Sequence, residues 1–243
     1  MRIALHAAGE VGTRAGLILL AERSLSALGI YGGGSLASDR RALRISELAG
    51  FDLLVTDDPN PAPLAAIAVE DGLSCVAAGE VPAAVAERFA TAGRTLLTGA
   101  NLHGLAMTLA AHEAAGMDGP VRASVAWTIP GKALRRGLAV GFPDPVGARW
   151  GRSVPGGIEV PVGGSWAAAS VTVTGRLAGK TVERLVGVAD QRDHLEAIAL
   201  ASGAISLASG AFTPGGHTPP EAAAAYLSAA LGLGLGVAVH QEP

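Results

Sequence analysis

The chain has 243 residues, of which 49% are hydrophobic and only 4% aromatic, and its formal net charge is −3. This length allows one large domain or two small ones. A small net charge without a basic block argues against nucleic acid as the main partner. The single cysteine, Cys75, leaves no internal disulfide and no cysteine-based metal site. No uncharged apolar stretch is long enough to span a membrane, and no basic leader precedes the apolar N-terminal residues. We therefore expect a soluble cytoplasmic protein without a membrane partner.

The first residues combine a strand, a glycine turn and a helix. The predicted strand covers residues 2–6, the turn residues 7–12 and the apolar helix residues 13–22. This unit suits a dinucleotide, because a backbone without side chains can approach a pyrophosphate and the helix N-terminus supplies N–H groups. Against the pattern G-x-G-x-x-G, Ala7 replaces the first glycine. The alternative is an ordinary strand-to-helix turn that binds nothing. The cofactor contacts expected at this turn are Gly9, Glu10, Val11 and Gly12.

Strands and helices alternate through the first hundred residues, which predicts a Rossmann-type parallel sheet with helices on both faces. The predicted strands after the first are residues 27–31, 51–56, 73–78 and 94–98, and the predicted helices are residues 63–70, 81–92 and 100–115, with residues 45–49 as a short helix or edge segment.

The pattern changes after residue 118, where strands follow one another without helices between them. This succession predicts a second α+β domain on a mixed or antiparallel sheet. The predicted strands are residues 121–129, 138–142, 158–162, 166–177 and 181–189, with loops at 149–157 and 210–220 and helices at 191–208 and from 219. The expected organisation of this α/β protein is a dinucleotide-binding domain at 1–118, a substrate and oligomerisation domain at 119–212, and a C-terminal helix at 213–243 that packs back on the first domain.

The end of the second predicted strand favours NADP over NAD. An acidic residue commonly ends this strand in NAD-binding units, where it accepts hydrogen bonds from the ribose. Here a loop without carboxylates, containing Gly34 and Ser35, is followed by Arg40 and Arg41. Two guanidinium groups suit a 2′-phosphate. The alternatives are a glycine turn with solvated arginines, or NAD binding through Asp39.

The carboxyl ends of the later strands are expected to line the nicotinamide side of the same crevice, because ligands bind at this edge of open α/β sheets. Asp57 could equally be a turn residue before a proline, and Asn101 is also a good helix N-cap. The candidate contacts are Thr56, Asp57, Ala78, Gly79, Gly99 and Asn101.

Two residues are candidates for proton transfer. Lys132, in a Pro-Gly loop between strands, is the first choice, and a solvated hairpin residue is its alternative. His103, in the first turn of a helix near the domain junction, is the second choice, and a packed or solvated histidine is its alternative. Arginines of the second domain would suit an anionic small-molecule substrate. The histidines lack the spacing of a metal site, so we expect no metal.

Three stretches resemble the dihydrodipicolinate reductase family of two-domain NAD(P)-dependent oxidoreductases. Residues 6–12 match its glycine turn, residues 98–105 its segment leading into the interdomain helix, and residues 188–197 its passage from a strand into a long helix. The family's His-His and Lys-x-Asp-Ala-Pro-Ser-Gly stretch has no counterpart, since residues 127–136 hold no histidine. The resemblance therefore implies the fold and the hydride donor, but a different substrate.

The expected function is NADPH-dependent reduction of a small carbonyl, imine or unsaturated substrate, with NAD as an alternative cofactor. The alternative function is a non-catalytic or regulatory nucleotide-binding protein of the same fold. The alternating second sheet, bordered by Trp150 and Trp166, leads us to expect a homodimer or homotetramer, and the family is similar in this respect.

Overall fold

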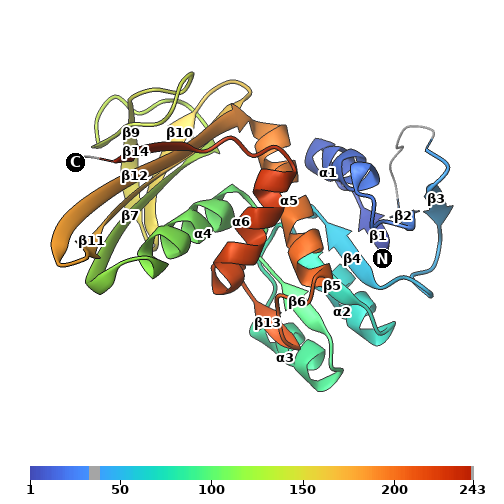
Figure 1. Cartoon of the computed structure of the whole chain (residues 1–243). Helices are drawn as coiled ribbons and strands as arrows, with labels where there is room; N and C mark the ends of the chain where they lie inside the picture. The colour runs from blue at the N-terminus through green and yellow to red at the C-terminus, as the bar shows by residue number, and fades with distance from the viewer. Residues whose placement is uncertain (33–38, 242–243) are drawn as a thin grey trace.

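The computed structural model describes residues 1–32 and 39–241 (Figure 1). Within these residues the chain forms two seven-stranded sheets, which we call sheet A and sheet B. The α/β fold class expected from the sequence is confirmed. None of the described helices is both long and apolar enough to cross a membrane.

Sheet A is entirely parallel and has the order β13-β6-β5-β4-β1-β2-β3. Its central strands β1, β4, β5 and β6 are mostly buried on both faces, as expected of a parallel sheet between helices, whereas the edge strand β3 is partly exposed. The strands are β1 (Arg2–His6), β2 (Ala27–Tyr31), β3 (Ala42–Ile45), β4 (Leu53–Thr56), β5 (Ser74–Ala77), β6 (Thr95–Leu97) and β13 (Gly215–His217).

The period-two alternation of β1 sorts its side chains between two helix layers. Ile3 and Leu5 point to the face covered by α1 (Glu10–Ala21) and α5 (Arg192–Ala208). Ala4 points to the face covered by α2 (Ala62–Glu70) and α3 (Ala83–Thr91). Sheet A is therefore a three-layer sandwich whose strands end at one common edge, which we call the carboxyl edge.

Sheet B is mixed and has the order β14-β12-β11-β7-β10-β9-β8, with β7 and β10 parallel and the other pairs antiparallel. The helix α4 (Leu102–Ala115) packs on β7 and β11, and it connects sheet A to sheet B (Figure 1). The strands are β7 (Asp118–Pro130), β8 (Leu138–Val140), β9 (Arg149–Val154), β10 (Gly157–Val162), β11 (Trp166–Leu177), β12 (Lys180–Gln191) and β14 (Ala238–Gln241).

The C-terminal part of the chain contacts both sheets. β13 adds an edge strand to sheet A and β14 adds one to sheet B, while η1 (Pro219–Ala222) and α6 (Ala223–Gly232) lie between them. Figure 1 shows α6 packed beside α4 and α5 in the middle of the molecule. The helix α5 follows β12 of sheet B in sequence but packs on α1 and sheet A. The division of the chain at residues 118 and 212 remains a prediction.

Several local predictions were wrong. Residues 42–45 form an edge strand that mostly precedes the short helix or edge segment expected at 45–49, and residues 149–154 form β9 instead of a loop. The strand β13 lies inside an expected loop, since two of its three residues are glycines and carry no side-chain pattern. Gly216 is required there because a Cβ would come within 2.7 Å of the Ala86 Cβ of α3. The strand β14 lies in a region expected to be helical.

Candidate functional site

A carboxylate occupies the glycine turn between β1 and α1. Asp57 follows β4, and its Oδ1 accepts a hydrogen bond from the Ala8 N–H at 2.6 Å. Its Oδ2 accepts from the N–H groups of Gly9 at 3.1 Å and Gly12 at 2.7 Å. The turn thus gathers three backbone donors around one anion, which is the arrangement that a helix N-terminus offers to a phosphate.

The two glycines of the turn have different surroundings. A Cβ on Gly12 would lie 2.6 Å from the Asp57 Oδ1 and 2.8 Å from the Ala7 Cα, whereas a Cβ on Gly9 would meet the Asp57 Oδ2 at 3.5 Å. Gly12 is therefore required by close approach. Glu10 and Val11 begin α1, and in the described part of the chain neither of their N–H groups donates a hydrogen bond. The donor set of the turn fits a pyrophosphate, but the Asp57 carboxylate stands where three of its donors converge.

The carboxyl ends of β4, β5 and β6 meet as expected. The Thr56 Oγ1 accepts from the Asp58 N–H at 3.0 Å and lies 3.4 Å from the Nδ1 of His6, at the end of β1. The Asn101 Nδ2 donates to the Ala78 carbonyl at 2.7 Å, and its Oδ1 accepts from Gly104 at the N-terminus of α4. Asn101 is thus the expected N-cap and at the same time connects two strand ends.

Gly79 and Gly99 are brought together at the same edge. The Gly99 N–H points to the Gly79 carbonyl at 3.4 Å, and Gly99 has the positive φ of +68° that favours glycine. Among the candidate cofactor contacts, the structure therefore places Gly9, Glu10, Val11, Gly12, Thr56, Asp57, Ala78, Gly79, Gly99 and Asn101 along the carboxyl edge of sheet A. Gly34 and Ser35 lie outside the described residues.

Arg40 and Arg41 do not lie at this edge. They come just before β3, whose first residue, Ala42, pairs with Leu28 near the start of β2. Arg41 donates to the carbonyl groups of Leu20 and Glu22 at the C-terminal end of α1. The chain has therefore crossed to the amino edge of the sheet by residue 40, and the position of these arginines does not support their assignment to a 2′-phosphate.

Asp39, the alternative NAD ligand, pairs with Arg41 at 3.1 Å. The hydrogen bond from the Arg41 side chain lowers the pKa of this carboxyl group. Asp39 is thereby also engaged at the amino edge of the sheet.

Arg44 is a residue that the sequence analysis missed. It lies in β3 opposite Ile30 of β2, near the carboxyl ends of both strands. Together with Gly32, Ile45 and Ser46 these two residues line an open hollow of about 340 Å³. The signal that would have found Arg44 is a strand at residues 42–45, because its parallel direction returns the chain to the carboxyl edge.

His103 lies at the junction of the two sheets. Its ring stacks on Trp127 of β7, with the ring centroids 4.2 Å apart. Its Nε2 is buried and, among the described residues, has no hydrogen-bond partner. Burial lowers the pKa of His103, although the charges of Glu80 and Glu159 act in the opposite direction. His103 therefore brings to the junction of sheet A and sheet B an imidazole with a lowered pKa and, among the described residues, one nitrogen without a hydrogen-bond partner.

Lys132 is exposed in the loop after β7. In residues 1–32 and 39–241, no hydrogen bond or ion pair connects Lys132 to another side chain, and no contact places it beside His103. The structure therefore does not bring the two candidates for proton transfer together.

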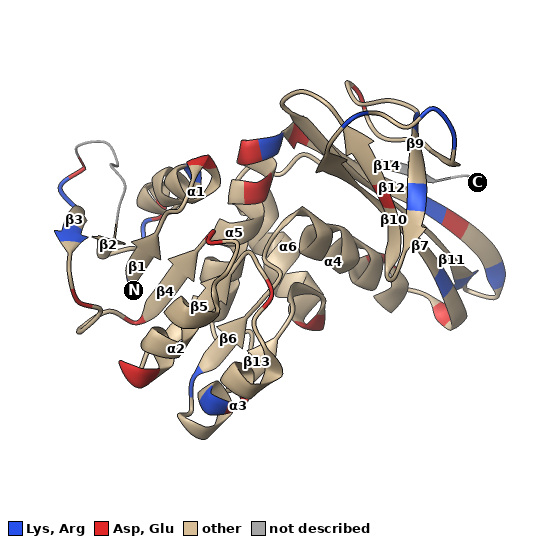
Figure 2. Cartoon of the chain, turned by 180° about the vertical axis from the view of Figure 1, so that it is seen from behind, with Lys and Arg blue, Asp and Glu red and all other residues tan. Residues whose placement is uncertain are grey.

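The N-terminal half of α5 places a second carboxylate, partly buried, near the carboxyl edge. Figure 2 shows charged residues at this end of α5, beside the N-terminal end of α1. Glu196 of α5 is partly buried, and its Oε2 accepts from the Leu102 N–H at 2.7 Å. Burial raises the pKa of Glu196. No local sequence signal predicts this contact, because 94 residues separate the partners.

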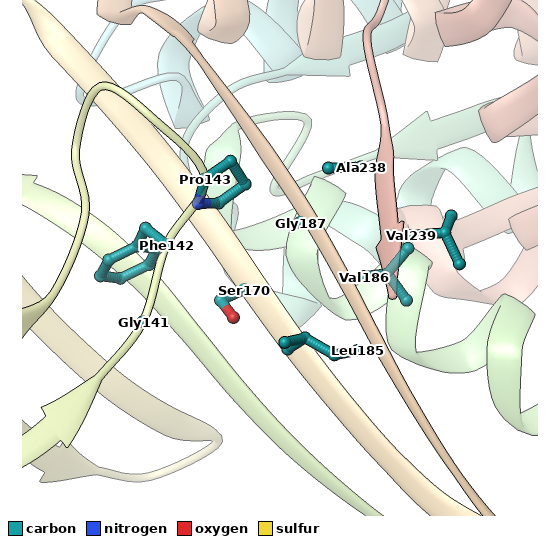
Figure 3. A pocket seen from close by; sticks show the side chains of 9 residues that line it. All are labelled: Gly141, Phe142, Pro143, Ser170, Leu185, Val186, Gly187, Ala238 and Val239. Carbon is teal, nitrogen blue, oxygen red and sulfur yellow. The ribbon is translucent and has the colours of Figure 1, made fainter. Parts of the chain in front are cut away.

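A separate hollow of about 270 Å³ lies on sheet B, away from the carboxyl edge of sheet A (Figure 3). Its lining is apolar apart from Ser170 and includes no titratable side chain, so it offers no group for acid–base chemistry. The described residues contain no cluster of three or more potential metal ligands. The lining residues of the hollow are Gly141, Phe142, Pro143, Ser170, Leu185, Val186, Gly187, Ala238 and Val239.

No family model and no curated protein matches the chain in sequence. Solved structures match its fold. Dipicolinate-bound dihydrodipicolinate reductase from Paenisporosarcina sp. TG-14 is 11% identical, covers 91% of this chain and 98% of its own, and has a TM-score of 0.55. An engineered D-amino acid dehydrogenase bound to NADP⁺ is 12% identical, with 91% and 93% coverage and a TM-score of 0.57. Amine dehydrogenase from Mycobacterium smegmatis is 10% identical, with 91% and 95% coverage and a TM-score of 0.54.

At these identities the likeness concerns the fold. It spans nearly the whole of each chain, including both sheets and the helices that join them. The chain therefore has the two-domain α/β fold of dihydrodipicolinate reductase and of these dehydrogenases, as the three sequence stretches led us to expect.

Proposed function

We propose that the protein is an NAD(P)-dependent oxidoreductase, acting by NADPH-dependent reduction of a small carbonyl, imine or unsaturated substrate. The observation that carries this proposal is the glycine turn, where the N–H groups of Ala8, Gly9 and Gly12 converge on one anion at the carboxyl edge of a parallel sheet. The fold shared with an NADP⁺-bound dehydrogenase supports the proposal.

We assign three parts of the cofactor to three places along this edge. The turn from Gly9 to Gly12 would hold the pyrophosphate, and the joined strand ends around Asn101 would hold the nicotinamide side. Arg44, in its hollow beside Gly32, replaces Arg40 and Arg41 as the cation for a 2′-phosphate. The nicotinamide, when bound, supplies the hydride.

His103 is the residue best placed to hold a proton. Its Nε2 is buried without a partner, so a substrate atom in the junction would satisfy it. Trp127 fixes the plane of the ring through the stacked contact. Lys132 remains the alternative proton donor. The negative charges of Glu80 and Glu159 raise the pKa of His103 and would repel an anionic substrate group placed directly beside the ring.

Titration with NADPH and NADH, followed by a substrate screen that monitors NADPH absorbance, tests the proposal. We expect NADPH to bind, and His103→Gln to retain this binding but lose turnover. Lys132→Met is the matched variant for the other candidate. Failure of the wild-type protein to bind either cofactor would overturn the proposal.

The second candidate function is nucleotide binding without catalysis. The exposure of Lys132 and its lack of contacts in the described part of the chain favour this function. It predicts NADPH binding without turnover of any substrate in the screen, and no effect of His103→Gln.

A further inference from the structure

We infer that Asp57 is a built-in competitor of the nucleotide phosphates, so that a dinucleotide binds by displacing its carboxylate from the N–H groups of the glycine turn. The inference rests on the proposed function, since it concerns the affinity of the same site.

The position of Asp57 is fixed by the sheet. Thr56 pairs with His6 in the parallel ladder of β4 and β1, so the residues that follow, Asp57 and Ala7, leave the two strands side by side. Both carboxylate oxygens are used, one by Ala8 and the other by Gly9 and Gly12. The absence of a side chain at Gly12 is what allows the carboxylate to come this close.

The charges around the turn make simultaneous occupation by a phosphate unfavourable. Glu10, in the first turn of α1, adds a second acidic residue. In the part of the chain that the structure describes, no Lys or Arg forms an ion pair with Asp57. A phosphate placed beside the carboxylate would therefore face a like charge with no ion-paired cation to offset it, and would compete for donors that are already used.

Without a nucleotide, the Asp57 carboxylate does what a phosphate would do. It satisfies the Gly12 N–H in the first turn of α1, where Gly9 as N-cap provides no side chain, and it places a negative charge at the positive end of the helix. The same contact thus stabilises the unliganded protein and lowers its affinity for the ligand. A role in helix capping alone would stabilise the turn without lowering the affinity.

The test compares Asp57→Asn and Asp57→Ala with Asp58→Asn. Asp58 is the neighbouring residue, and its carboxylate accepts from the Asn60 N–H at 2.8 Å instead of from the turn, so Asp58→Asn makes the same charge change outside the turn. We expect both Asp57 variants to bind NADPH about tenfold more tightly than the wild-type protein, as removal of one charge at close range predicts, while Asp58→Asn stays within about twofold. NADPH affinity that is equal or weaker in both Asp57 variants would overturn the inference.

A second measurement separates this inference from the proposed function. Inorganic pyrophosphate is titrated while the backbone amide NMR signals of Ala8, Gly9 and Gly12 are followed. If no variant binds a dinucleotide but the Asp57 variants alone gain pyrophosphate-dependent shifts at these three amides, the proposed function fails, whereas the competition between the Asp57 carboxylate and phosphate groups for the turn stands. If the wild-type protein binds NADPH and the Asp57 variants show no gain with either ligand, the inference fails and the proposed function stands. Asp57→Asn keeps the size of the side chain and one acceptor, so it serves if Asp57→Ala does not fold.

Discussion

The Oε2 atom of Glu196 accepts a hydrogen bond from the backbone N–H of Leu102 at 2.7 Å, joining the second turn of α5 to the first turn of α4. The Asn101 side chain satisfies another free donor in the first turn of α4, the Gly104 N–H. The N-terminus of α4 is thereby capped by the residue that precedes it in the chain, Asn101, and also by a residue of α5, which follows β12 in sequence. The contact fixes α4, which carries His103, against α5, which covers sheet A.

This contact predicts a pH-dependent stability. Because burial raises the pKa of Glu196 above its ordinary value of 4.5, the folded protein binds this proton more tightly than the unfolded chain does. The contribution of Glu196 to the free energy of unfolding therefore falls as the pH rises from about 4.5 through the folded-state pKa. Glu196→Gln keeps an acceptor for Leu102 and does not titrate, so urea denaturation should show a flatter pH dependence. Glu47→Gln, an exposed change, is the control, and an unchanged slope in Glu196→Gln would contradict the prediction.

Gly12→Ala should destabilise the protein, even though alanine is the better helix former. The new Cβ would lie 2.6 Å from the Asp57 Oδ1 and 2.8 Å from the Ala7 Cα, so the turn must open. Overpacking of this kind costs about 1–3 kcal/mol, measurable as a lower denaturation midpoint. Gly141→Ala is the control, because a Cβ at Gly141 would meet no atom within 4 Å. Equal effects of the two changes would show that the turn can relax freely.

Arg41 and Arg44 should have separable effects. Arg41→Ala removes the side-chain donors to the end of α1 and should lower the thermal midpoint without changing the preference for NADPH over NADH. Arg44→Ala should weaken NADPH about tenfold and leave NADH unchanged, since only NADPH carries the 2′-phosphate. Fluorescence titration of both cofactors checks this. A loss of NADPH preference in Arg41→Ala alone would place the phosphate at the other edge of the sheet.

The half-buried imidazole of His103 predicts a second pH effect, of opposite sign. Because burial lowers the pKa of His103 below its ordinary value of 6.5, the unfolded chain binds this proton more readily. The stability that depends on the neutral ring is therefore lost as the pH falls from about 6.5 through the lower folded-state pKa. His103→Gln should remove this part of the pH dependence, and His112→Gln, an exposed change on the same helix, should not. NMR titration of the His103 ring measures its pKa directly, and a titration midpoint at or above 6.5 would refute the prediction.

The parts of the fold that could be predicted are those whose information is local. The strands at residues 27–31 and 166–177 have the bounds expected from their apolar pattern, since turn residues delimit both. Likewise, the alternation along β1 places Ile3 and Leu5 against one helix layer and Ala4 against the other. The short strand β13 could not be predicted, because it depends on a glycine contact with α3.

The parts of the site that could not be predicted depend on chain direction and register. Arg40 and Arg41 follow the second strand in sequence, but the sequence does not show at which residue the connection reaches the other edge of the sheet. Asp57 was expected at the crevice, yet its bonds to the turn depend on the pairing of Thr56 with His6. The contact of Glu196 with Leu102 could not be predicted either, since nothing near residue 102 indicates which distant element will cap the N-terminus of α4.

The two edge strands β13 and β14 have a consequence for synthesis on the ribosome. Both lie after residue 214, so a nascent chain that ends before them leaves β6 at the edge of sheet A and β12 at the edge of sheet B. Open strand edges pair readily with other chains. Neither sheet can be completed before nearly the whole polypeptide has been translated, and until then the incomplete chain exposes the long edge of β12 and the edge of β6, which β14 and β13 cover in the finished protein.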